Sequence, residues 1–135
     1  MEKKGEHPYL GIIINYDRDK KLDKFSLDTL QDRYLWQNET SPQEAFARAS
    51  VFVSTFKEET DFDMAQRIYN YVSNLWFMFS TPILSNGGTT RGLPISCFLN
   101  YVPDNREGLS SHYDENIWLA LSLIHISEPT RPSSI

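Results

Sequence analysis

The chain has 135 residues, of which 40% are hydrophobic and 13% aromatic, and its formal net charge is -5. This length suits one modest domain with a hydrophobic core. The chain is acidic and has no run of Lys or Arg longer than the pair Lys20-Lys21, so we expect no nucleic-acid partner. No apolar run reaches the ~20 residues that span a bilayer, and the N-terminus lacks the apolar core of a secretory signal. We therefore expect a cytoplasmic protein with no membrane segment.

The first 24 residues are predicted to form an arm or linker. Residues 1–8 are charged and typical of a turn, and residues 9–14 are apolar and β-branched enough for a short strand or a packed arm. Residues 17–24 are a charged run of the kind found in linkers or on surfaces. Ser26 then suits the N-cap of a helix that runs to Trp36.

The clearest local signal is the tetrapeptide Ser41-Pro42-Gln43-Glu44. It combines a capping hydroxyl, a proline at the first helical position and a glutamate three residues after the cap, so a helix begins there and is expected to end near Lys57. A further helix is expected after a cap at Thr60 or Asp61. The apolar residues of the two helices recur at helical spacing: Ala45, Phe46, Ala49, Phe52, Val53 and Phe56, then Phe62, Ala65, Ile68, Tyr69, Val72, Leu75, Trp76 and Phe79. We expect residues 25–79 to form a helical domain in which these helices pack as an antiparallel hairpin and the aromatic faces form its core rather than a cofactor site.

Residues 80–101 are the stretch in which a site is most expected. Pro82 is predicted to end the preceding helix, which places Thr81 just past its C-terminus. Asn86-Gly87-Gly88 permits left-handed backbone, so the following loop can bring its amides close to a ligand. Residues 95–102 are almost continuously apolar, which favours a strand covered on both faces. A turn at residues 103–105 then leads into a helix over residues 106–120, with an apolar face of Leu109, Tyr113, Ile117 and Trp118.

Cys97 is the only cysteine of the chain, so it has no partner for an internal disulfide. Two interpretations follow from the residue alone. It is either a small buried hydrophobe or a thiol that acts with a group outside this chain.

Three segments together closely resemble the large subunit of ribonucleotide reductase. They are Phe79-Ser80-Thr81-Pro82-Ile83-Leu84-Ser85-Asn86-Gly87-Gly88, Gly92-Leu93-Pro94-Ile95-Ser96-Cys97-Phe98-Leu99-Asn100 and Glu115-Asn116-Ile117-Trp118-Leu119-Ala120. The resemblance covers about residues 25–120. It implies a mainly α fragment, with an N-terminal helical domain that leads into the first β-strand and helix of a ten-stranded α/β barrel. Residues 80–120 would be the start of that barrel.

The resemblance also implies an activity, the radical-based reduction of ribonucleotides to deoxyribonucleotides. Cys97 matches one cysteine of the pair that reduces the substrate, and its mate and the cysteine that carries the thiyl radical have no match in this chain. Thr81 matches a threonine that contacts the substrate, and Ser96 stands where a serine close to the substrate is expected. Without the resemblance, a helix-terminating turn would explain Thr81 and strand packing would explain Ser96.

Asp104, Asn105 and Arg106 match the turn in which the family binds a specificity effector, ATP or a deoxynucleoside triphosphate. Some relatives have Ser-Leu in place of Asn105-Arg106, so Asp104 is the firmest of the three. An ordinary helix cap is the competing interpretation of Asp104.

The resemblance implies partners for the whole enzyme as well: a ribonucleotide substrate, a small subunit whose metal centre supplies the radical, a reductant of the thioredoxin or glutaredoxin type, and a second large subunit. This chain itself is expected to bind no metal and no resident cofactor.

Residues 121–135 resemble the in-frame translation of a transposase sequencing adapter, and members of the family continue after the position of Ala120 with a glycine-rich turn. We expect these residues to be an artefact tail and exclude them, His125 included, from the functional predictions. Two other hypotheses remain for the chain: a free-standing helical interaction module, and an enzyme that uses the Cys97 thiol alone. The latter would need a basic residue beside the thiol, and Arg91 is the only cation close in sequence.

Overall fold

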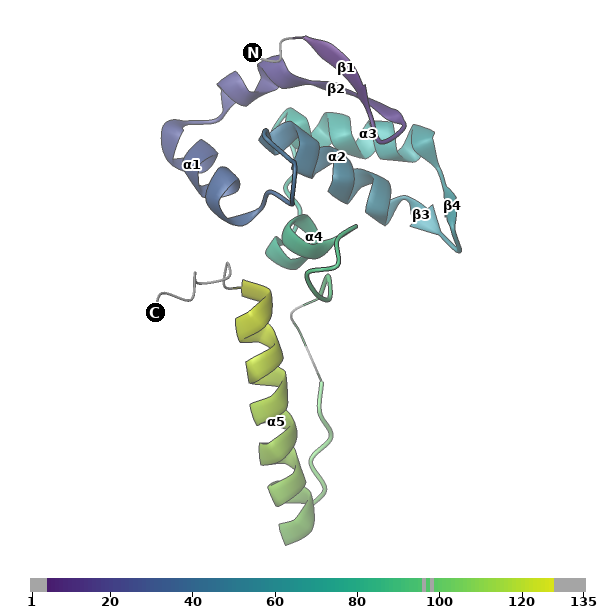
Figure 1. The fold of residues 1–135 in the computed structure, drawn as a ribbon. Coiled ribbons are helices and arrows are strands. Elements are labelled where there is room, and N and C mark those ends of the chain that lie inside the picture. Colours follow the sequence, from purple (N-terminus) through teal and green to yellow (C-terminus); the bar gives the residue numbers. More distant parts are fainter. Residues whose placement is uncertain (1–4, 96, 98, 128–135) are drawn as a thin grey trace. The chain divides into compact units, whose positions relative to one another are not determined.

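A computed structural model describes residues 5–95, 97 and 99–127 of the chain (Figure 1). The chain divides into two compact units, with the division between Pro94 and Ile95. The first unit contains two small two-stranded sheets and four α-helices, and the second contains one long helix in its described part.

An antiparallel hairpin opens the first unit. Strand β1 (Glu6–Tyr9) pairs with strand β2 (Ile12–Asn15), and Tyr9 lies opposite Ile12. The two turn residues, Leu10 and Gly11, have φ angles of 51° and 85°, as a tight hairpin turn requires. The short strand predicted within residues 9–14 is confirmed only as β2, since residues 9–11 belong to the end of β1 and the turn. Ile12 and Ile14 are buried, so one face of β2 joins the core.

The charged residues after the hairpin pack against the rest of the first unit. They form a 3-10 helix, η1 (Tyr16–Lys21), in which the carboxylate of Asp19 accepts hydrogen bonds from Ser41 Oγ at 2.6 Å and Gln43 Nε2 at 2.9 Å. These residues therefore fix the start of the next long helix.

Helix α1 (Lys24–Arg33) is capped by Asp23, whose carboxylate accepts the N–H of Ser26 at 2.7 Å. The prediction of Ser26 as the cap was wrong, because the aspartate three residues earlier supplies the same acceptor and starts the helix sooner. The helix also ends before Trp36. Only Leu30 of α1 is fully buried, so this helix packs loosely on the unit.

Helix α2 (Pro42–Val53) has the predicted capping box: Ser41 Oγ accepts the N–H of Gln43 at 3.1 Å and Glu44 Oε2 accepts the N–H of Ser41 at 3.2 Å. It ends four residues before the predicted end. A second hairpin, β3 (Thr55–Phe56) with β4 (Glu59–Thr60), follows it. Its turn places Lys57 and Glu58 at φ 48° and 70°, a conformation that helices exclude.

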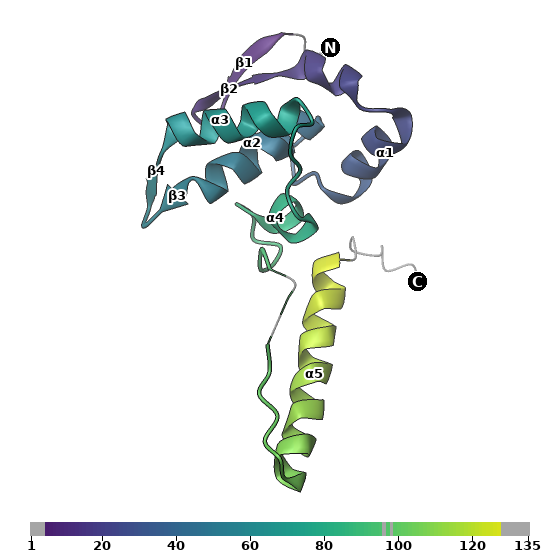
Figure 2. The same ribbon diagram turned by 180° about the vertical axis from the view of Figure 1, so that it is seen from behind.

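Helix α3 (Phe62–Ser73) is capped by Asp61, as predicted, with the N–H of Met64 at 2.9 Å from its carboxylate. It ends at Ser73 rather than Phe79, and Leu75 follows with φ 64°. Helices α2 and α3 lie side by side as the predicted hairpin (Figures 1 and 2). The core between and around them is Ala45, Phe46, Ala49, Ala65, Tyr69, Val72, Phe79 and Leu84, with Ile12 and Ile14 of the hairpin.

A short helix α4 (Thr81–Asn86) completes the first unit. The prediction that Pro82 ends a helix was wrong, since Pro82 stands in the first turn of α4 and Ser80 is its N-cap. A proline is tolerated there because the first N–H groups of a helix have no partner within it. Thr81 is therefore the first residue of a helix and does not follow one.

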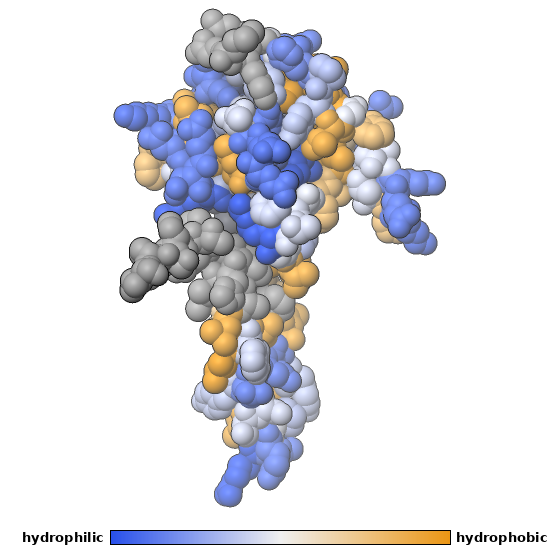
Figure 3. Space-filling model, viewed as in Figure 1, coloured by the Kyte–Doolittle hydropathy of each residue, from blue (hydrophilic) through white to orange (hydrophobic). Residues whose placement is uncertain are grey.

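The strand predicted over residues 95–102 falls partly on residues 96 and 98, which lie outside the described residues. Of the described ones, Ile95, Cys97 and residues 99–102 belong to no sheet, and a strand forms only where a neighbouring strand pairs with it. The predicted helix over residues 106–120 is confirmed as α5, which runs farther, from Arg106 to Ser127. The apolar face predicted for it lies open: Leu109, Tyr113, Ile117 and Trp118 are each at least half exposed. Apolar residues are visible along this helix in Figure 3.

The described part of the chain is thus mostly helical, with two small sheets. None of its helices combines the length and the apolar character that crossing a membrane requires.

Candidate functional site

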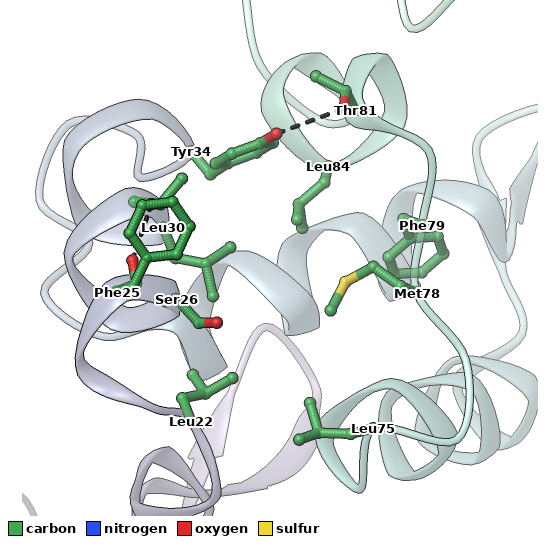
Figure 4. A pocket seen from close by; sticks show the side chains of 11 residues that line it. Leu22, Phe25, Ser26, Leu30, Tyr34, Leu75, Met78, Phe79, Thr81 and Leu84 are labelled. Atoms are coloured by element: carbon green, nitrogen blue, oxygen red, sulfur yellow. Dashed lines mark hydrogen bonds between the residues drawn. The ribbon is translucent and has the colours of Figure 1, made fainter.

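A cavity of about 350 Å³ lies in the first unit between α1 and the segment that leads into α4. Its lining is mostly apolar, with a few hydroxyls: Leu22, Phe25, Ser26, Thr29, Leu30 and Tyr34 on one side, and Leu75, Met78, Phe79, Thr81 and Leu84 on the other. Figure 4 shows Tyr34 and Thr81 together at one end of this cavity, with Leu22 and Leu75 at the opposite end.

The predicted substrate threonine, Thr81, has one side-chain partner. Its Oγ1 lies 3.3 Å from the hydroxyl of Tyr34, and either oxygen can be the donor. Within the described residues, neither hydroxyl makes another hydrogen bond. Thr81 itself is exposed, so its hydroxyl can also reach solvent or a ligand.

Arg48, in the middle of α2, fixes the surroundings of this pair. Its Nε and Nη2 bond the carboxylate of Glu39 at 2.7 and 3.2 Å, and the remaining N–H groups reach the backbone carbonyls of Tyr34 (3.1 Å), Leu84 (3.1 Å) and Gly87 (2.7 Å). A guanidinium has five N–H donors, and all five have acceptors here. Arg48 therefore joins the C-terminal end of α1 to α4 through one buried group.

The loop after α4 is held from both ends. Asn86 Nδ2 donates to the carbonyl of Leu93 at 2.9 Å, and the N–H and hydroxyl of Thr89 bond the carbonyl of Asn86. Arg91 donates to the carbonyls of Arg33 at 3.1 Å and Leu35 at 3.0 Å. The glycine-containing loop, which was expected to bring its amides close to a ligand, is thus tied to the C-terminal end of α1.

Arg91 also adds positive charge beside Arg48. Its guanidinium lies 5.2 Å from the ring centre of Trp36. Burial lowers the pKa of Arg91, and the nearby charge of Arg48 lowers it further, while Glu39 acts in the opposite direction.

A second hollow, of about 400 Å³, lies where the first hairpin meets the segment before α2, and it is lined in part by Tyr9, Trp36, Glu39 and Arg48. Burial raises the pKa of Tyr9 to about 12, and the carboxylates of Glu39 and Glu44 add to the shift. The phenol therefore stays protonated at neutral pH.

The residues predicted for the reducing step lie in the second unit. Cys97 is an exposed free thiol, and Ser96 lies outside the described residues. Thr81 belongs to the first unit and Cys97 to the second.

The predicted effector residues stand at the start of α5. Asn105 caps this helix, since its Oδ1 accepts the N–H of Gly108 at 2.7 Å. Asp104 is exposed and, within the described residues, makes no hydrogen bond or ion pair, and the same holds for the Arg106 side chain. The cap predicted as the alternative role of Asp104 is therefore made by its neighbour.

Within the described ranges, no three His, Cys, Asp or Glu side chains come together in a group that could hold a metal ion.

Sequence reasoning missed Tyr34 and Arg48 as parts of this region. One signal was available: Arg48 interrupts a run of small and apolar residues, Ala45-Phe46-Ala47-Arg48-Ala49, on a helix with a good cap. A charged residue in such a run indicates a buried ion pair, although its partner cannot be read from the pattern.

The first unit is a small, mainly helical domain in which Thr81 begins α4 and the loop after α4 is tied to the end of α1. The family model described as "Ribonucleotide reductase, all-alpha domain" matches residues 20–92, which include α1 to α4 and Thr81. This chain belongs to the ribonucleotide reductase large-subunit family, and its first unit is the all-α domain of that family.

Individual relatives agree with this assignment. The chain is 47% identical to the ribonucleoside-diphosphate reductase large subunit of Invertebrate iridescent virus 6 over 98 residues, which cover 73% of this chain and 10% of the relative. It is 40% identical to the large subunit of Invertebrate iridescent virus 3 over 104 residues, or 77% of this chain and 16% of that one. The subunit alpha of Helicobacter pylori is 29% identical over 120 residues, 85% of this chain and 15% of its own length. The chain thus spans about a tenth to a sixth of these relatives.

Proposed function

We propose that the chain is an N-terminal segment of a ribonucleoside-diphosphate reductase large subunit and that the whole enzyme reduces ribonucleotides to deoxyribonucleotides. One observation carries the proposal: the match to the all-α domain extends through α4 and includes Thr81. The identity of 47% with a named large subunit supports it.

In the proposed reaction a thiyl radical removes the 3'-hydrogen of the substrate. The 2'-hydroxyl then leaves as water, a hydrogen takes its place, and two cysteine thiols are oxidised to a disulfide. The 3'-hydrogen is finally returned to the substrate, which regenerates the thiyl radical. Cys97 would be one of these thiols, with its mate outside this chain, and its exposure is compatible with such a partner. Thr81 would donate its hydroxyl to the substrate, and Ser96 would lie close to it.

The effector is the second proposed ligand, ATP or a deoxynucleoside triphosphate at Asp104, Asn105 and Arg106. The residues fit such a group in two respects. The carboxylate of Asp104 makes no hydrogen bond or ion pair with the described residues and can accept one from a ribose hydroxyl. The Arg106 side chain, also without a partner among them, can bind a phosphate. Asn105 is already used as the helix cap, so it would contribute through its backbone.

The remaining proposed partners belong to the whole enzyme. They are a small subunit with a metal centre that generates the radical, a thioredoxin- or glutaredoxin-type reductant that restores the disulfide to thiols, and a second large subunit. A cytoplasmic location follows for an enzyme that makes DNA precursors.

The test is to obtain the gene downstream of this segment, produce the intact subunit with its small subunit, and measure reduction of a ribonucleoside diphosphate. We expect turnover by the intact enzyme and none by the 135-residue chain, which lacks the other cysteines of the reaction. Replacing Cys97 by Ser in the intact subunit should abolish repeated turnover with a thioredoxin-type reductant. An intact subunit without any reductase activity would reject the proposal.

A second candidate function is a helical interaction module without catalysis. The open apolar face of α5, which includes Leu109, Tyr113 and Ile117, favours it, because exposed apolar faces bind partners. It predicts that the chain alone self-associates through α5, which light scattering of the purified chain would show. The triple replacement of these three residues by Ser should then give a monomer.

A further inference from the structure

We infer that Tyr34 is a positioning residue that holds the hydroxyl of Thr81 in the orientation needed to donate to an anionic substrate group. This inference rests on the proposed substrate role of Thr81. It adds Tyr34, the residue that directly follows α1 and to which no functional role had been given.

The hydroxyls of Tyr34 and Thr81 form an isolated pair. Tyr34 and Thr81 lie 3.3 Å apart at one end of a mostly apolar cavity (Figure 4), and each is the other's only side-chain partner among the described residues. Of the other hydroxyls in this lining, that of Thr29 is occupied by the carbonyl of Phe25 at 2.7 Å. Among the described residues, the Thr81 side chain therefore has one internal hydrogen bond that can select its rotamer.

Hydrogen bonds from Arg48 and Arg91 hold the backbone around this hydroxyl pair. The backbone carbonyl of Tyr34 accepts a hydrogen bond from Arg48, and the same guanidinium holds the carbonyls of Leu84 and Gly87, at the end of α4. The buried Arg48 side chain thus holds both the backbone at Tyr34 and the end of the helix that begins with Thr81. Arg91 adds a second tie, from the loop after α4 to the carbonyls of Arg33 and Leu35 on either side of Tyr34.

The acidity of the two hydroxyls determines which of them donates the proton in this hydrogen bond. A phenol is a stronger acid than an aliphatic alcohol, so the favoured arrangement has Tyr34 donating to Thr81 Oγ1. The proton of Thr81 is then free to point outward, which is the polarity that a phosphate oxygen requires. Hydrogen bonds in such a chain strengthen one another, so the 3.3 Å contact should shorten when an anion binds to Thr81.

The first test uses the 135-residue chain and does not depend on activity. Three-bond NMR couplings of the Thr81 methyl group report its rotamer. We expect one dominant rotamer in the wild-type chain and averaged couplings in Tyr34→Phe, while Thr29 keeps its couplings in both. Tyr71→Phe is the matched control, because the Tyr71 hydroxyl makes no hydrogen bond within the described residues. Unchanged Thr81 couplings in Tyr34→Phe would overturn the inference.

The second test uses the intact large subunit. Removing one hydrogen bond of this kind should raise KM for a ribonucleoside diphosphate about 3- to 10-fold in Tyr34→Phe and leave kcat within about twofold. In a subunit that already carries Thr81→Val, adding Tyr34→Phe should change KM no further, because Tyr34 acts through Thr81. An equal rise in KM in both backgrounds would contradict the inference. If the wild-type subunit reduces no ribonucleotide, the proposed function fails, and the couplings still decide whether Tyr34 orients Thr81.

Discussion

Arg48 and Glu39 form a two-point ion pair, with Arg48 Nε 2.7 Å from Glu39 Oε1, in which the side chains are only 6% and 4% exposed. Removal of one member of a buried pair leaves the other charge without a partner. Removal of Arg48 would also leave the carbonyls of Tyr34, Leu84 and Gly87 without their donor. The pair thus determines how α1, α2 and α4 are joined.

Arg48→Lys should lower the free energy of unfolding by about 3 kcal/mol, because an ammonium group has three donors and cannot reach five acceptors. Urea denaturation followed by tryptophan fluorescence measures the change. Arg67→Lys, at an exposed position of α3, should shift the free energy by less than about 0.5 kcal/mol. Equal effects of the two substitutions would mean that the Arg48 contacts contribute nothing.

Gly11→Ala should destabilise the chain more than Gly5→Ala. Both glycines have positive φ angles, 85° and 77°, but a Cβ at Gly11 would lie 2.3 Å from the Phe62 ring, whereas one at Gly5 would meet nothing within 4 Å. We expect losses of about 2 to 3 kcal/mol and about 1 kcal/mol respectively. Thermal unfolding of the two variants measures the difference, and similar losses would show that Phe62 moves aside without cost.

Ser41→Ala should cost about 1.5 kcal/mol, because Ser41 accepts the N–H of Gln43 and donates to Asp19. Ser80→Ala is the matched control, since Ser80 is the N-cap of α4 but makes no side-chain capping bond. Denaturant midpoints of the two variants provide the comparison. A loss in Ser80→Ala as large as in Ser41→Ala would contradict the assigned capping roles.

Stability should fall in alkaline solution because of Tyr9. Its pKa is raised to about 12 in the folded chain, while an unfolded tyrosine titrates near 10. The stability contributed by Tyr9 is fully present below about pH 10 and is lost as the pH rises through the folded pKa of about 12. Between these two pH values the unfolded chain has released the proton and the folded chain has not, which favours unfolding. The Tyr9 side chain is partly exposed, so solvent screening limits the loss to about 1 kcal/mol.

The measurement is urea denaturation at about pH 9 and about pH 11. Tyr9→Phe should reduce the alkaline loss of stability, and Tyr101→Phe should not, because Tyr101 is 85% exposed. An alkaline loss that is identical in all three proteins would assign it to other groups, such as lysines or Tyr69.

The starts of α2 and α3 were predictable from sequence and their ends were not. Ser41, Glu44 and Asp61 identify α2 and α3 because a cap is a local interaction of neighbouring residues. The ends depend on Lys57, Glu58 and Leu75 adopting left-handed backbone, which these residue types rarely do. Nothing in the local pattern indicates this, since the conformation is imposed by the second hairpin and by packing of the segment before α4.

Pro82 shows a second limit of local patterns. A proline is compatible with the end of one helix and with the first turn of another, and its neighbours in sequence fit both. Burial of Phe79 and Leu84 in the core decides between the two, because it requires an extended segment and a new helix direction.

The candidate site was predictable only in part, for a related reason. Thr81 is identified by a resemblance. Tyr34 and Arg48 belong to the site through hydrogen bonds between residues far apart in sequence, Tyr34 with Thr81 and Arg48 with the carbonyl of Leu84. Such pairs leave no periodic signal. The strand expected over residues 95–102 stays a prediction, because the partner strands of a barrel would have to come from other segments.

The contacts of the first hairpin also bear on how this protein avoids aggregation. The outward N–H and C=O of Ile13 are both bonded by the amide of Gln66, at 2.7 and 2.9 Å, and the N–H of Asn15 is bonded by Tyr69 Oη at 2.8 Å. On the other strand, Pro8 lies opposite Ile13 and has no N–H to offer. Two side chains of α3 thus take the place of a third strand, and a proline blunts the opposite edge. A nascent or truncated chain that has formed α3 therefore exposes little strand edge to which another chain could add.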